Sequence, residues 1–125
     1  MTTDCQYHEC KYLLNQVDHR YGEKVRICYD PSMLSLLAKL SSSESSQPLI
    51  NIYVEKMYQY LIQEVLNYTW PIEQTIRPTR MIDAHPEGNY CGPILNETQK
   101  IISVSLARAG ILPSQTCYNF LNLFL

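Results

Sequence analysis

The sequence predicts an α/β domain, in which helices pack against a sheet that contains at least one buried strand. Three observations lead to this prediction. Two segments carry apolar residues at the three- and four-residue spacing of amphipathic helices, and a stretch with Pro and Gly separates two β-prone runs. The third is the mostly apolar run KIISVSL at residues 100–106. Such a run is typical of a strand buried on both faces, as in a parallel sheet.

Size and composition are those of one soluble domain. The 125 residues are 46% hydrophobic, which is enough to build a single core. A net charge of -2 with scattered cations argues against a nucleic-acid partner. No apolar run reaches the roughly 18 residues that span a bilayer, and the polar start lacks a signal-peptide pattern. We therefore predict a cytoplasmic protein with no membrane partner.

The first half of the chain is predicted to contain two helices. Residues 1–24 form a polar lead-in with at most one helical turn at residues 11–17, and a β-prone run follows at residues 25–29. Asp30 and Pro31 predict a helix start, because Asp accepts bonds from free N–H groups and Pro needs no donor there. Apolar spacing carries this helix to the serine-rich loop at residues 41–47.

The second predicted helix begins near Pro48 and is stopped by the sequence NYTWP. Its apolar side chains share one face, while most charged and amide side chains lie elsewhere. Core packing is the preferred interpretation of this face, and a partner surface is the alternative. The face consists of Ile50, Tyr53, Val54, Met57, Tyr58, Leu61 and Val65.

The second half is predicted to hold a hairpin, a core strand and a final helix. Residues 77–84 and 90–95 are expected to pair around HPEGN, whose Pro and Gly suit a turn. The run at 100–106 is the expected core strand. A helix from Pro113 onward would place four apolar side chains on one face, namely Cys117, Phe120, Leu121 and Phe124.

A candidate anion site lies between the expected core strand and the last helix, at Arg108, Ala109 and Gly110. Ligands of open α/β sheets bind at the carboxyl ends of strands. Glycine lets the backbone approach a ligand closely or take a positive φ. Free N–H groups of the turn and helix start can hold an anion, and the guanidinium of Arg108 suits phosphate oxygens. The alternative is a plain strand-to-helix connection with an exposed arginine.

Other candidate chemistry has less support. Cys5, His8 and Cys10 lie close together but lack the second ligand pair of a zinc site, so no metal site is predicted. The five cysteines are odd in number and irregularly spaced, which predicts reduced thiols. Nothing pairs one of them with a histidine as a nucleophile, and catalytic residues stay unassigned.

Three stretches carry a resemblance to a known family: DPSMLSLLAKL, PLINIYVEKMYQYLIQEVL and GPILNETQKIISVSLARAGILPSQTCYNFLN. They resemble the two opening helices and the Arg-Ala-Gly strand in the N-terminal half of the uracil phosphoribosyltransferase family. The resemblance implies an α/β, incomplete type I phosphoribosyltransferase-like fold. In it, residues 1–24 are a lead-in, and residues 25–125 supply N-terminal helices and a β-hairpin arm, followed by the first core strand and helix.

The family joins uracil to phosphoribosyl pyrophosphate, forming UMP and pyrophosphate in pyrimidine salvage, which is a glycosyltransferase reaction. The resemblance implies that Arg108, Ala109 and Gly110 contact phosphoribosyl pyrophosphate, and that magnesium accompanies the pyrophosphate. However, the family's ribose-phosphate loop, roughly Asp-Pro-x-x-Ala-Thr-Gly-x-Ser, and its uracil-binding segment do not occur in this sequence. We therefore expect a truncated chain that is inactive alone.

Two alternatives remain open at this point. The chain is a non-catalytic assembly or dimerisation module, which forms a homo-oligomer or pairs with a full-length enzyme, or it is a small helical protein whose likeness to the family is accidental. Retention of Arg108 favours descent from the enzyme, whereas the missing ribose-phosphate loop favours the assembly module.

Overall fold

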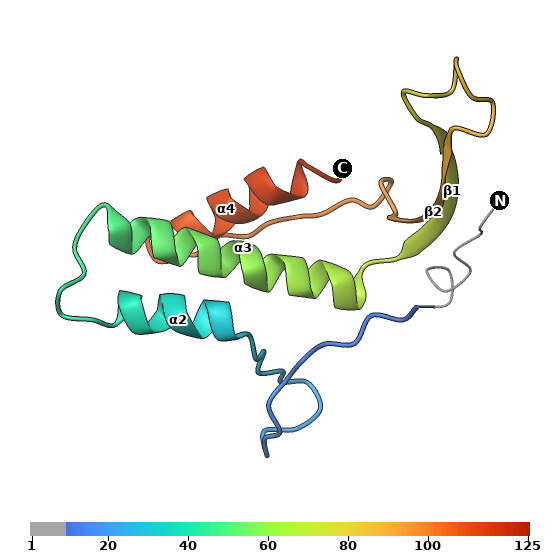
Figure 1. Ribbon diagram of the computed structural model, residues 1–125. Helices are drawn as coiled ribbons and strands as arrows, with labels where there is room; N and C mark the ends of the chain where they lie inside the picture. The colour runs from blue at the N-terminus through green and yellow to red at the C-terminus, as the bar shows by residue number, and fades with distance from the viewer. Residues whose placement is uncertain (1–9) are drawn as a thin grey trace.

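The computed structural model describes residues 10–125, which form three helices, one β-hairpin and long connecting segments (Figure 1). The helices are α2 (Pro31–Leu40), α3 (Leu49–Thr69) and α4 (Ile111–Leu121), and the strands are β1 (Ile72–Pro78) and β2 (Asn89–Leu95). The described part of the chain is therefore a small mixed α/β domain whose sheet has two antiparallel strands.

Helix α2 begins where the sequence predicts. Asp30 has an extended backbone, with φ −148° and ψ 116°, and its carboxylate accepts a hydrogen bond from the Met33 N–H group at 2.9 Å. Pro31 occupies the first helical position, where no donor is needed. At the other end, the Ser41 N–H group donates to the Leu37 carbonyl at 2.9 Å. Both ends of α2 are thus satisfied by residues beside it in the sequence.

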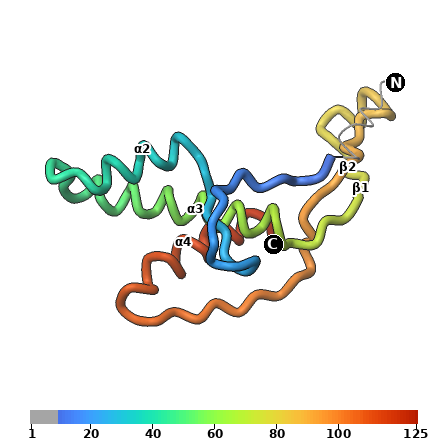
Figure 2. Tube along the Cα trace, turned by 90° about the horizontal axis from the view of Figure 1, so that it is seen from below, coloured from blue at the N-terminus to red at the C-terminus, as the bar shows by residue number. Residues whose placement is uncertain are grey.

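Helix α3 is the central element. It contacts both α2 and α4, which lie on opposite sides of it, with α2 running antiparallel to it (Figures 1 and 2). Helices α2 and α4 cover two different sides of α3, so they do not fully bury the single apolar face expected from the sequence. Leu61 and Val65 are 46% and 58% exposed, whereas Leu66, which is outside that face, is 4% exposed.

The hairpin forms, but its first strand is not the one predicted. Strand β1 pairs with β2 from Ile72 opposite Leu95 to Pro78 opposite Asn89, and residues 79–84 belong to the connecting loop. These residues bond locally instead, for example from the Ala84 N–H group to the Met81 carbonyl at 3.1 Å. The hairpin projects from the end of α3 (Figure 1), and no described helix packs on it.

The base of the hairpin is tied to the end of α3. The indole Nε1 of Trp70 donates to the Asn96 carbonyl at 2.9 Å, and the Asn96 N–H group donates to the Pro71 carbonyl at 2.9 Å. Arg77 and Glu97 add an exposed ion pair at 2.9 Å. These contacts hold the arm in place, since a two-stranded hairpin is only marginally stable by itself.

Several expected elements do not form in the described residues. The predicted core strand is wrong: residues 100–105 run extended but make no backbone hydrogen bond to other described residues (Figure 2). Residues 25–29 contribute one isolated bridge, Gln16 to Cys28, and residues 11–17 contain no helix. The reason is physical: a strand needs a hydrogen-bonded neighbour, and local sequence does not supply one.

The fold is open rather than compact. The chain has an accessible surface of 10348 Å² for 14.5 kDa, whereas a compact monomer of this mass exposes about 6,900 Å². Among residues 10–125, Leu66 is the only hydrophobic side chain classed as buried. Large apolar side chains are exposed on the extended segment, at 90% for Ile102, 80% for Val104 and 79% for Leu106.

No helix within residues 10–125 combines the length and the hydrophobicity that crossing a bilayer would require.

Candidate functional site

The predicted anion site lies in the turn directly before α4. Gly110 is the N-cap residue, with φ −80° and ψ −6°, and its N–H group donates to the Leu106 carbonyl at 2.7 Å. A Cβ at Gly110 would lie only 2.7 Å from the Leu106 oxygen and 2.8 Å from the Leu106 nitrogen. Glycine is therefore required because the turn folds closely onto its own backbone, and not because of a positive φ.

This turn leaves several hydrogen-bond donors unused. The side chain of Arg108 is exposed and makes no hydrogen bond or ion pair with other described residues. The N–H groups of Arg108, Ala109 and Leu112 also have no partner within residues 10–125, whereas the Ile111 N–H group bonds to the Arg108 carbonyl at 3.2 Å. A guanidinium and free N–H groups beside a helix N-terminus form an arrangement that can bind an anion.

The donors at this turn suit phosphate oxygens and do not suit a metal ion. Residues 98–125 contain no Asp or Glu, and no cluster of three His, Cys, Asp or Glu side chains with a metal-binding arrangement occurs among the described residues. Magnesium is held in proteins by carboxylates together with substrate phosphates and water. The residues of the turn therefore offer no ligands to magnesium.

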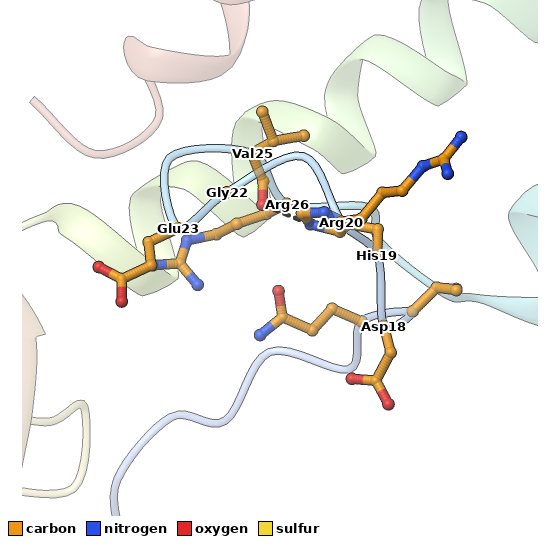
Figure 3. Close-up of a pocket in the computed structure, with 9 residues that line it drawn as sticks. Asp18, His19, Arg20, Gly22, Glu23, Val25 and Arg26 are labelled. Carbon is orange, nitrogen blue, oxygen red and sulfur yellow. Dashed lines mark hydrogen bonds between the residues drawn. The ribbon is translucent and has the colours of Figure 1, made fainter.

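A second site candidate, which the sequence did not reveal, is a cleft in the loop at residues 16–26 (Figure 3). Its volume is about 650 Å³. The two arms of the loop pair through the Val17 N–H group and the Ile27 carbonyl at 2.8 Å, and the Tyr29 N–H group donates to the Asn15 carbonyl at 2.9 Å. The one sequence signal for this turn is Gly22, which takes a φ of 96° that favours glycine.

The cations of this loop do not converge on one point. Arg20 points away from the loop in Figure 3. Arg26 is engaged elsewhere, because its guanidinium carbon lies 4.0 Å from the centre of the Tyr68 ring on α3. This cation–π contact attaches the loop to α3, and it leaves the cleft without the paired positive charges of a phosphate site.

A third group of polar side chains lies between the N-terminal segment and α3. The Tyr12 hydroxyl donates to the Glu64 carboxylate, and Tyr60 and Cys28 line a neighbouring apolar cavity of about 310 Å³. Burial, followed by the charge of Glu64, raises the pKa of Cys28 and raises that of Tyr60 to about 12. A raised pKa keeps the Cys28 thiol protonated, so it is a poor nucleophile.

The chain was compared with protein-family models, with curated proteins and with solved structures, and none of the three comparisons finds a match. The family resemblance of residues 103–122 therefore stays a prediction. Of the residues singled out in the sequence, Arg108, Ala109 and Gly110 do lie together in one turn. Cys5 and His8 lie outside the described residues.

Proposed function

We propose that this chain is a uracil phosphoribosyltransferase-like protein of pyrimidine salvage, and that the turn from Ala107 to Gly110 is its contact with phosphoribosyl pyrophosphate. The observation that supports the proposal is the state of Arg108, which is exposed and makes no hydrogen bond or ion pair with any other residue in the range 10–125. An arginine held in a tight turn at a helix N-terminus has both the charge and the geometry to bind a diphosphate.

In this proposal the turn supplies only part of the substrate-binding site. Arg108 and the neighbouring N–H groups would hold the pyrophosphate end of phosphoribosyl pyrophosphate. Magnesium would arrive with the substrate, bound to its phosphate oxygens and to water, because residues 98–125 contain no carboxylate. No ribose-phosphate loop of the Thr-Gly-Ser type occurs in the 125 residues, so we propose that the chain binds the substrate but does not turn it over by itself.

Calorimetric titration of the chain with pyrophosphate and with phosphoribosyl pyrophosphate tests this proposal. Arg108→Ala should weaken binding by roughly tenfold to a hundredfold, which is the value of one hydrogen bond to a charged group. Arg80→Ala, at an exposed position in the hairpin loop, is the matched control and should bind like the unchanged chain. Equal affinities for the two variants, or no binding to the unchanged chain, would contradict the proposal.

Turnover is measured separately, as pyrophosphate release from uracil and phosphoribosyl pyrophosphate. The proposal expects none from the chain alone. Pyrophosphate release that disappears in Arg108→Ala would show that the turn is the substrate contact. It would also show that the chain needs no further segment for turnover. The cytoplasmic location predicted from the sequence fits a salvage enzyme and remains part of the proposal.

A second candidate function is a non-catalytic assembly module, and the openness of the fold favours it. The accessible surface of 10348 Å² exceeds that of a compact monomer by about 3,500 Å². The hairpin has no packing partner among the described helices, and residues 100–105 are extended and make no backbone hydrogen bond to another residue of the described range 10–125. Such surfaces are typical of chains that bury them against another chain.

Light scattering coupled to size-exclusion chromatography checks this second candidate. The assembly module predicts a mass above 14.5 kDa for the chain by itself, or a stable complex when a full-length uracil phosphoribosyltransferase is added. A monomer that forms no such complex would rule it out, whatever the outcome of the pyrophosphate titration.

A further inference from the structure

The loop at residues 16–26 is closed by a histidine whose two ring nitrogens have different partners. The Nε2 atom of His19 lies 2.6 Å from the Val25 carbonyl oxygen, and the Nδ1 atom lies 3.0 Å from the Tyr21 backbone nitrogen. A carbonyl oxygen only accepts, so Nε2 must carry a proton. A backbone N–H group only donates, so Nδ1 must be free of one. Both bonds are made only by the neutral ring protonated on Nε2.

Protonation of His19 would disrupt one of these bonds and keep the other. The added proton sits on Nδ1, where it faces the Tyr21 N–H group, so that two donors oppose each other at a distance of 3.0 Å. The bond from Nε2 to Val25 would remain, with a charged donor. Protonation therefore alters the tip of the loop, residues 19–22. The centre of the Tyr21 ring also lies there, 5.5 Å from the centre of the His19 ring.

Four charged side chains line the cleft beside the His19 ring. They are the acidic side chains of Asp18 and Glu23 and the basic side chains of Arg20 and Arg26. The loop contacts α3 through Arg26, which lies on the neutral ring of Tyr68. The hydrogen-bond polarity at Nδ1 is the feature that distinguishes the two protonation states.

We propose that residues 19–22 are a proton-operated switch, in which neutral His19 holds the Tyr21 backbone and a protonated ring releases it. Histidine is the side chain that ordinarily changes charge between about pH 5 and 8, so the switch is tested by lowering the pH across that range. Release would reshape the open cleft of about 650 Å³ that the loop residues line. This inference is independent of the proposed phosphoribosyltransferase function, because it uses no residue of the Arg108 turn.

Nuclear magnetic resonance of the full chain tests the switch at about pH 7.5 and about pH 5.5, on either side of the usual histidine range. At the higher pH the nitrogen shifts of the His19 ring should be those of the Nε2–H tautomer. At the lower pH the hydrogen-exchange protection factor of the Tyr21 amide should fall by roughly five- to tenfold, the factor expected for one hydrogen bond. The Val17 amide, bonded to Ile27, should stay protected and so show that the loop arms remain paired.

Three variants separate the switch from a purely structural role. In His19→Asn, the side-chain oxygen can accept the same bond from the Tyr21 N–H group as an Asx turn, so protection should persist at both pH values. His19→Phe removes the acceptor and should leave Tyr21 unprotected at both. His85→Gln, at an exposed histidine of the hairpin loop, should retain the response of the unchanged chain.

Three results would overturn the inference. One is a His19 ring protonated on Nδ1 at the higher pH, and another is a Tyr21 amide whose protection does not depend on pH. The third is a pH response that survives in His19→Asn, which would place the titrating group elsewhere.

Discussion

Truncation of Leu66 measures how much of the stability rests on the contact between α3 and its neighbours. Leu66 is 4% exposed, so Leu66→Ala withdraws three buried carbon atoms at about 0.8 kcal/mol each, or about 2.4 kcal/mol. The neighbouring side chains of α3 are half-buried or exposed and can relax into the space. The cavity contribution should therefore be small, and the total should lie near the lower end of the roughly 2–5 kcal/mol range for such substitutions.

Leu61→Ala is the matched control, because it makes the same chemical change on the same helix at a side chain that is 46% exposed. About half of the apolar surface is buried there, so we expect a cost of about 1.3 kcal/mol. Urea titration of the full chain, followed by far-UV circular dichroism and linear extrapolation, gives both free energies of unfolding. Equal costs at the two positions, or a larger cost at Leu61, would refute the assignment of the core to Leu66.

Three further predictions follow from the local geometry. Burial and nearby carboxylates raise the pKa of Tyr60 to about 12, so an ultraviolet pH series should show a tyrosine that ionises near that pH. Because the folded state favours the protonated form of Tyr60, stability should fall as pH rises from about 10, and Tyr60→Phe should remove this component. A serine hydroxyl and the first-turn N–H groups hold the pKa of Asp30 below its ordinary value. The contribution of Asp30 to stability should therefore be lost as pH falls through the folded-state pKa. An acid unfolding transition that is unchanged in Asp30→Ala would contradict this. Gly110→Ala should lower the urea midpoint and weaken pyrophosphate binding, because the new Cβ would meet the Leu106 backbone; the expectation fails if both stay unchanged.

The elements that were predicted well are those whose signals are local. The start of α2 depends on Asp30 and Pro31, which cap and begin the helix through their own chemistry. The end of α3 was predicted from NYTWP, and Trp70 is indeed its C-cap residue. The hairpin was predicted from the Pro and Gly of its connection, but its register was not. Register depends on which residues pair across the two strands, and β1 begins at Ile72 rather than at residue 77.

The candidate sites divide in the same way. The residues of the Arg108 turn are adjacent in sequence, so their proximity could be predicted, although the reason for Gly110 is the approach of the Leu106 backbone and not a positive φ. The loop around His19 could not be predicted. Its closure depends on pairing between residues 15–17 and 27–29, and no periodic pattern accompanies such a short contact.

By itself, the sequence determined the two amphipathic helices, the capping of α2, the presence of a hairpin and the grouping of Arg108, Ala109 and Gly110, because each follows from neighbours within a few residues. Only the tertiary structure decided that residues 100–105 pair with no strand of the described part of the chain, that Leu66 and not Val65 is buried, and that His19 joins two arms of a loop. These depend on which distant segments meet, and a pattern of apolar residues indicates what can be buried but not what will cover it.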